Sequence, residues 1–127
     1  MSSLPKINKT VLSVFAPVLI GAGILGFLTP PSLALMSGAA PYNIFHIVFG
    51  FVGLGCLLSK RPALIRGFNV GFGAVDLYQA VASFVGLFPR ELFQYKVADD
   101  VLHVVIGGVL VGVGVWADRG GVAKEGT

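Results

Sequence analysis

The chain has 127 residues, of which 55% are hydrophobic and 12% are charged, and its formal net charge at pH 7 is +3. A soluble domain of this size needs more polar surface than that, so the composition predicts an integral membrane protein. The pI of about 9.3 does not indicate nucleic-acid binding, because the basic residues are spread over helix ends instead of forming one patch.

Four apolar stretches have the length that a membrane-spanning helix needs, about 17–25 residues. We predict an all-α fold in a single domain, residues 1–127, with helices at about 11–28, 42–58, 64–88 and 97–117 and a flexible C-terminal tail at 118–127. Prolines 30, 31, 62 and 89 mark the ends of three of these stretches. The expected architecture is a four-transmembrane-helix bundle running up-down-up-down.

The distribution of basic residues predicts the orientation. Lys6 and Lys9 precede the first stretch and Lys60, Arg61 and Arg66 lie between the second and third, whereas the connection from the first to the second is uncharged. The positive-inside rule then places both termini in the cytoplasm, in a bacterial inner membrane or its equivalent. A cleaved signal peptide that uses residues 11–28 as its apolar core is the main alternative.

The only two histidines occur in two copies of one pattern, which are Asn43-x-x-His46-x-x-x-Gly50 and Asp100-x-x-His103-x-x-x-Gly107. On a helix, residues three and four apart share a face. Because the same pattern occurs once in each half of the chain, we expect the two halves to form two similar helical hairpins. Helices two and four run parallel in such a bundle, so both imidazoles are expected at a similar depth.

Three interpretations of this pattern remain open. Facing imidazoles could hold a tetrapyrrole, either haem through His46 and His103 or chlorophyll through one of them, with Asn43 or Asp100 orienting a ring and the two glycines leaving clearance. A transition metal such as zinc is a second interpretation. In the third, Asn43 and Asp100 cap their helices and the glycines serve packing. The third interpretation needs no cofactor. The sequence does not identify which metal, if any, would bind under the second.

An acidic residue, Asp76, lies near the middle of the third stretch. A small and polar stripe runs along the same helix face, formed by Asn69, Gly73, Asp76, Ala80 and Ser83, with Tyr78 and Gln79 beside it. An ionised carboxylate is costly inside a bilayer unless it is paired or hydrated. We expect the stripe to face the bundle interior or a partner. Asp76 then serves either as a proton or ion relay or as a protonated acid hydrogen-bonded to Tyr78, Gln79 or a neighbouring helix.

The two histidine patterns and the aromatic Tyr78 of the third helix resemble a bacterial family of small four-helix integral membrane proteins that is catalogued as a domain of unknown function. The resemblance covers about residues 11 to 116 and implies an integral membrane protein with no assigned activity. The sequence contains no G-x-S-x-G, Walker-type, C-x-x-C or H-E-x-x-H motif, and we expect no enzyme.

The predicted function is that of a non-catalytic structural or accessory subunit that packs in the lipid bilayer against other membrane subunits or copies of itself. One alternative is an electron-transfer or pigment protein that binds haem or chlorophyll. Another is a proton or ion relay through Asp76.

Overall fold

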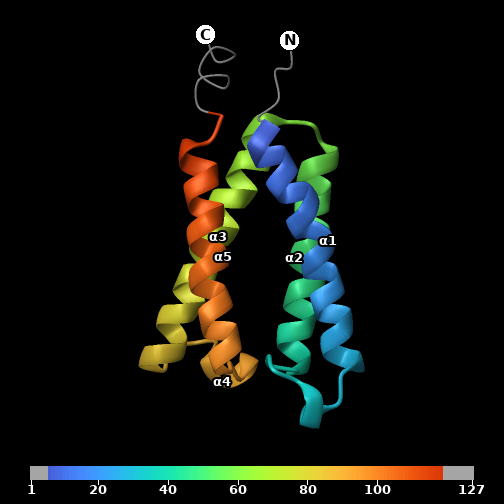
Figure 1. The fold of residues 1–127 in the computed structure, drawn as a ribbon, viewed down its shortest axis with the longest axis vertical. Coiled ribbons are helices and arrows are strands. Elements are labelled where there is room, and N and C mark those ends of the chain that lie inside the picture. The colour runs from blue at the N-terminus through green and yellow to red at the C-terminus, as the bar shows by residue number, and fades with distance from the viewer. Residues whose placement is uncertain (1–5, 119–127) are drawn as a thin grey trace.

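The computed structural model describes residues 6–118, and within that range every regular element is a helix. Four of these helices are long, namely α1 (Lys6–Leu28), α2 (Ala40–Leu58), α3 (Pro62–Val85) and α5 (Val97–Trp116). Two short ones lie in the connections, η1 (Pro31–Leu33) between α1 and α2 and α4 (Arg90–Phe93) between α3 and α5 (Figure 1). The predicted all-α class is therefore confirmed. Of the predicted flexible tail, all but Asp118 lies outside the described residues.

Two helix ends differ from the prediction, and each has a local cause. α1 begins at Lys6 and not near residue 11, because Asn8 in its first turn donates hydrogen bonds to the carbonyl oxygens of Val113 and Ala117 at the end of α5, at 3.2 and 3.3 Å. α3 ends before residue 88 because Gly86 adopts a φ of 76°. That left-handed conformation terminates a helix and favours glycine.

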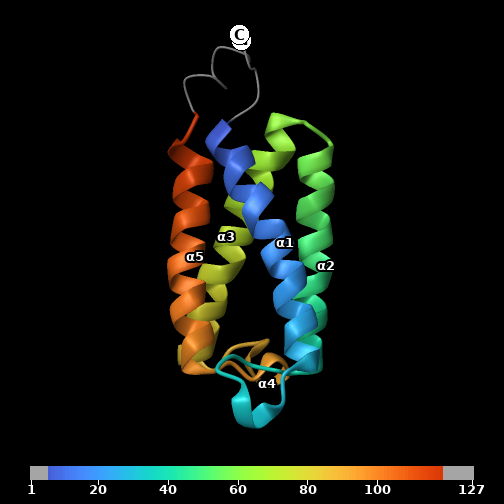
Figure 2. The ribbon, with the colours of Figure 1, turned by 45° about the vertical axis from the view of Figure 1, so that its right-hand side comes forward.

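The long helices pack as two hairpins, α1 against α2 and α3 against α5, with far fewer contacts between the hairpins. Glycines permit this packing, since small residues let helix backbones approach closely. A Cβ atom on Gly50 would lie 2.5 Å from Cγ1 of Ile20 in α1, and one on Gly107 would lie 2.9 Å from the carbonyl oxygen of Gly73 in α3. Figure 1 shows the hairpins close together where α1 begins and further apart towards α4, and Figure 2 shows the same arrangement from another side.

An apolar core joins the hairpins where they approach. Its buried members are Leu12, Phe15, Ala16, Leu19, Ile65, Phe68, Phe72 and Leu110. The Phe72 ring of α3 has its centroid 5.6 Å from that of Phe15 in α1 and 5.5 Å from that of Phe68. This core contains no polar side chain, so the polar contacts between the hairpins lie on either side of it.

The outer faces of the helices carry many large apolar side chains. Among the described helices, α1 from Ile7, α2 and α5 are long and apolar enough to cross a membrane by length and composition. α3 is not among them, because Asn69, Asp76 and Gln79 lower its hydropathy. These three side chains are nevertheless only 0%, 4% and 2% exposed, so the polar face of α3 is turned inward. The arrangement is compatible with an integral membrane protein.

Candidate functional site

Tyr42 and His103 connect the two hairpins at the end of the molecule that holds α4. Tyr42 is in the first turn of α2 and His103 is in α5, and their side chains are 1% and 5% exposed. The hydroxyl oxygen of Tyr42 lies 2.7 Å from Nε2 of His103. When Nε2 carries no proton, the hydroxyl donates this hydrogen bond. Tyr42 was not among the predicted site residues, although its position four residues before His46 places both on one helix face.

Tyr42 also contacts the other histidine. Its ring centroid lies 4.2 Å from that of His46, with a tilt of 54°, and 5.9 Å from that of His103, with the planes nearly perpendicular at 89°. The two predicted site histidines therefore do belong to one buried cluster. The tyrosine ring contacts both of them, which the spacing of the histidine patterns did not indicate.

Asp99 forms the second connection between the hairpins. Its Oδ2 accepts hydrogen bonds from the backbone N–H groups of Ser37 and Lys96, both at 2.8 Å. Ser37 belongs to the connection between α1 and α2, and its hydroxyl donates a 2.5 Å hydrogen bond to the carbonyl oxygen of Phe93 in α4. Asp99 is fully buried, and among the described residues its Oδ1 has no hydrogen-bond partner.

The predicted capping of α2 and α5 by Asn43 and Asp100 is wrong. Both residues lie in the fourth position of their helices, one turn too late to cap them. Asp99 caps α5 through the N–H of Lys96, while Asn43 donates a 3.1 Å hydrogen bond to the carbonyl oxygen of Gly38. The error arose because two adjacent acids precede His103 and the sequence does not say where the helix begins.

Two aromatic residues near α4 surround the cluster. Phe93 packs on Tyr42 with a centroid separation of 5.2 Å, and Tyr95 meets His103 edge-on at 5.4 Å. Burial, together with the charge of the nearby Asp99, raises the pKa of Tyr95 above its ordinary value. The Tyr95 phenol therefore stays protonated and acts as a hydrogen-bond donor. Neither residue was predicted, because both lie in a connection without helical periodicity.

Tyr95 joins the cluster to the acidic residue of α3. Its hydroxyl donates a 2.8 Å hydrogen bond to Oε1 of Gln79, and Nε2 of Gln79 donates a 3.1 Å hydrogen bond to Oδ1 of Asp76. Asp76 is 4% exposed. This polar series leads from the middle of α3 to the α4 end. On its other side lies the apolar core.

The rest of the predicted α3 stripe behaves unevenly. Asn69, Gly73, Asp76 and Ala80 are buried, as expected, and Ser83 is half-buried. Tyr78 is 45% exposed, and its hydroxyl donates to the carbonyl oxygen of Phe88 at 2.6 Å instead of to Asp76. Of the two neighbours predicted to bond Asp76, only Gln79 does so in the described part of the chain.

A separate polar cluster lies at the opposite end, where the helix termini meet. Asn69 of α3 donates to the side-chain oxygen of Asn8 at 3.0 Å, and Asn8 donates from its backbone to Asp118 at 2.9 Å. Burial opposes ionisation of Asp118. The backbone hydrogen bonds from Asn8 and Ile7 outweigh that effect and hold the pKa of this carboxyl below its ordinary value. Asn8 had not been predicted as a site residue, because it precedes the apolar stretch.

The fit of a tetrapyrrole depends on available ring nitrogens and on clearance beside them. Nε2 of His103 is engaged with the Tyr42 hydroxyl, so ligation through that atom would require this bond to break. Gly50 and Gly107 face the neighbouring helix of their own hairpin and leave no space for a flat ring there. Within residues 6–118, no group of three or more His, Cys, Asp or Glu side chains is placed to hold a metal ion. The cluster as arranged does not fit a bis-histidine tetrapyrrole.

Hydrogen bonds at both ends join residues of different hairpins, Tyr42 with His103 at the α4 end and Asn8 with Asn69 at the other. Comparisons of the chain with protein-family models, with curated proteins and with solved structures give no match. Membership of the unknown-function family therefore stays a prediction.

Proposed function

We propose that the protein is a non-catalytic integral membrane protein whose four long helices cross the bilayer and whose termini are both cytoplasmic. In this proposal it serves as a structural or accessory subunit that packs against other membrane helices. One observation carries the proposal. Most strongly polar side chains within the long helices are buried inside the molecule, and some of them, such as Asn69 and His103, form hydrogen bonds between the hairpins, while the exposed faces carry many large apolar side chains.

The exposed fractions support a bilayer as the surrounding medium. Phe51 in α2 is 57% exposed, Val14 in α1 is 63% exposed and Val105 in α5 is 56% exposed. Water would oppose an apolar surface of this extent, whereas hydrocarbon does not. α3 also exposes little polar surface to the surrounding medium, because neighbouring residues cover its Asp76 and Gln79.

Charge supports the orientation. Arg61 and Arg66 lie at the α2–α3 end together with Lys9 of α1, and the connection that contains η1 carries no charge. The α4 end carries acids and bases in nearly equal number. An excess of Lys and Arg on one side predicts that this side is cytoplasmic.

Cysteine labelling tests the orientation. In a Cys56→Ala background, Arg61→Cys and Glu91→Cys place one thiol at each end, and both original side chains are exposed. A membrane-impermeant maleimide should label the Glu91→Cys protein in intact cells and the Arg61→Cys protein only after lysis. The opposite pattern would reverse the orientation. Labelling of both in intact cells would contradict a membrane barrier between these ends.

Purification tests the role as a subunit. The tagged full-length chain should be recovered from native membranes together with a stoichiometric membrane partner or as a defined homo-oligomer. The untagged strain serves as the control for nonspecific recovery. Recovery of the chain as a monomer, after mild crosslinking of the membranes, would contradict the proposal.

A second candidate function, a proton relay, is favoured by the series Asp76–Gln79–Tyr95. Buried acidic side chains often belong to proton pathways inside membranes, and the Gln79 amide links the Asp76 carboxyl to the Tyr95 hydroxyl. The apolar core beyond Asp76, which includes Phe72 and Phe68, provides no continuation in the described residues, and for this reason we rank the relay second. A relay predicts that Asp76→Asn abolishes proton flux in proteoliposomes while Glu91→Gln, an exposed control, retains it. Equal flux in the two variants would remove this candidate.

A further inference from the structure

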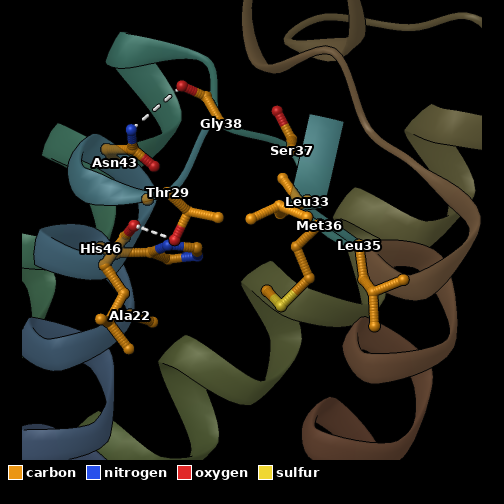
Figure 3. Close-up of a pocket in the computed structure, with 12 residues that line it drawn as sticks. Ala22, Thr29, Leu33, Leu35, Met36, Ser37, Gly38, Asn43 and His46 are labelled. Carbon is orange, nitrogen blue, oxygen red and sulfur yellow. Dashed lines mark hydrogen bonds between the residues drawn. The ribbon is translucent and has the colours of Figure 1, made fainter. Parts of the chain in front are cut away.

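A cavity of about 310 Å³ lies between the end of α1, the connection that follows η1 and the start of α2 (Figure 3). Leu25, Leu33 and Met36 contribute apolar surface to it, and Asn43 and His46 contribute polar atoms. The lining contains no Lys, Arg, Asp or Glu side chain, and His46 is its one titratable residue. This volume is at the lower end of the range of about 300–1,000 Å³ that ligand pockets occupy.

His46 has hydrogen-bonding capacity that the described residues do not use. Its side chain is only 7% exposed, and its ring contacts Tyr42 and Phe45 through their aromatic faces or edges, without a hydrogen bond to either. Figure 3 shows the ring among the residues that line the cavity, with Leu33 and Met36 across from it. The other polar side chains of the lining already donate hydrogen bonds to backbone carbonyl oxygens, namely Thr29 to Leu25, Ser37 to Phe93 and Asn43 to Gly38.

His103 and His46 therefore differ, although they occupy equivalent places in the two sequence patterns. His103 has a tyrosine hydroxyl 2.7 Å from its Nε2. His46 has no such partner in the part of the chain that the structure describes. A neutral imidazole provides one N–H donor and one nitrogen acceptor, and buried polar groups in proteins are normally hydrogen-bonded. A group from outside the chain would satisfy His46.

We propose that this cavity binds a neutral lipophilic molecule whose carbonyl or hydroxyl oxygen hydrogen-bonds to the imidazole of His46. The lining contains no Lys or Arg side chain, which argues against an anionic head group. The cavity is too small for a whole lipid but accommodates a polar head with a short apolar segment. The proposal rests on the membrane location given above, because the molecule would arrive from the bilayer.

Two kinds of molecule share this chemistry, quinones and neutral glyceride esters. Ubiquinone-1 is the probe for the first and monoolein for the second, and n-decane controls for filling by hydrocarbon alone. Binding is measured with the full-length chain in phosphatidylcholine nanodiscs. The protein is labelled with ¹⁵N and ¹³C only in histidine, so its spectrum contains two imidazoles, which His46→Gln assigns.

The expected result is a saturable shift of the His46 imidazole signals with ubiquinone-1 or monoolein, while those of His103 stay in place. The probe that produces the shift identifies the class of ligand. If the His46 signals do not shift at probe concentrations up to about 1 mM, any binding is weaker than a Kd of about 1 mM. That result would overturn the proposal. Equal shifts of both histidines, or a His46 shift of the same size with n-decane, would also overturn it.

Filling the cavity provides the matched variant. Ala22→Phe places a ring in the space that Ala22 lines, and Ala74→Phe adds the same ring on the exposed face of α3. Ala22→Phe should abolish the His46 shift and Ala74→Phe should retain it. An unchanged His103 signal shows that the variant is folded. If Ala22→Phe does not fold, Leu33→Trp in the adjoining connection fills the same cavity, and a shift that persists in it contradicts the proposal. Cysteine labelling tests the membrane location independently, so failure of one proposal is distinguishable from failure of the other.

Discussion

Replacing Tyr42 by Phe removes one hydroxyl from the centre of the buried cluster and keeps the aromatic ring. The hydroxyl forms the 2.7 Å hydrogen bond to Nε2 of His103, and Nδ1 of that ring already has no partner among the described residues. The variant therefore leaves a 5% exposed imidazole without any hydrogen bond in the described chain. We expect the free energy of unfolding to fall.

The size of this effect follows from two reference values. Leaving a buried polar group unsatisfied costs about 1–3 kcal/mol, whereas interhelical hydrogen bonds in membranes contribute about 0.6 kcal/mol on average. Because His103 loses its only described partner, we expect a decrease of about 1–2 kcal/mol, towards the first value. A double-mutant cycle with His103→Phe should give a coupling energy of about 1 kcal/mol.

Unfolding of the full-length chain by sodium dodecyl sulfate in dodecylmaltoside micelles, followed by helical circular dichroism, provides the measurement. Tyr78→Phe is the control, because its hydroxyl bonds a backbone carbonyl near the surface and its side chain is 45% exposed. The control should lower the free energy by less than about 0.5 kcal/mol. If Tyr42→Phe has no larger effect than Tyr78→Phe and shows no coupling to His103, the cluster does not join the hairpins.

The same assay tests three further features. Gly50→Ala should lower the free energy of unfolding by about 1–3 kcal/mol through overpacking. The control is Gly55→Ala, whose Cβ would meet nothing within 4 Å, and it should leave the free energy unchanged or raise it by about 0.5–1 kcal/mol. Equal effects of the two substitutions would contradict the close approach of α1 and α2 at Gly50. Asp99→Ala should destabilise by about 1–2 kcal/mol more than Asp100→Ala, because only Asp99 accepts the capping N–H, and the reverse order would restore Asp100 as the cap. The lowered folded pKa of Asp118 means that its contribution is fully present above the ordinary carboxyl pKa of about 4 and is lost as the pH falls through the folded value. Asp118→Asn should remove this part of the acid destabilisation, and an unchanged pH profile in the variant would argue against these hydrogen bonds.

Local sequence patterns were sufficient for the helices and for the direction of their polar faces. Apolar stretches of bilayer length predicted the four long helices, and the spacing of Asn69, Asp76 and Ala80 predicted which face of α3 is buried. These features depend on helical periodicity, which residues three and four apart already express. The pattern also placed His46 and His103 at the same end.

Only the tertiary structure decided how those histidines are used. Tyr42 bonds His103 across 61 positions of the chain, and Ser37 bonds Asp99 across 62. Contacts at such separations depend on how the hairpins dock, which no local spacing expresses. The extension of α1 to Lys6 has the same origin, since Asn8 reaches the end of α5. The two histidine patterns look alike in sequence, yet their surroundings differ: one imidazole bonds a tyrosine and the other lines a cavity.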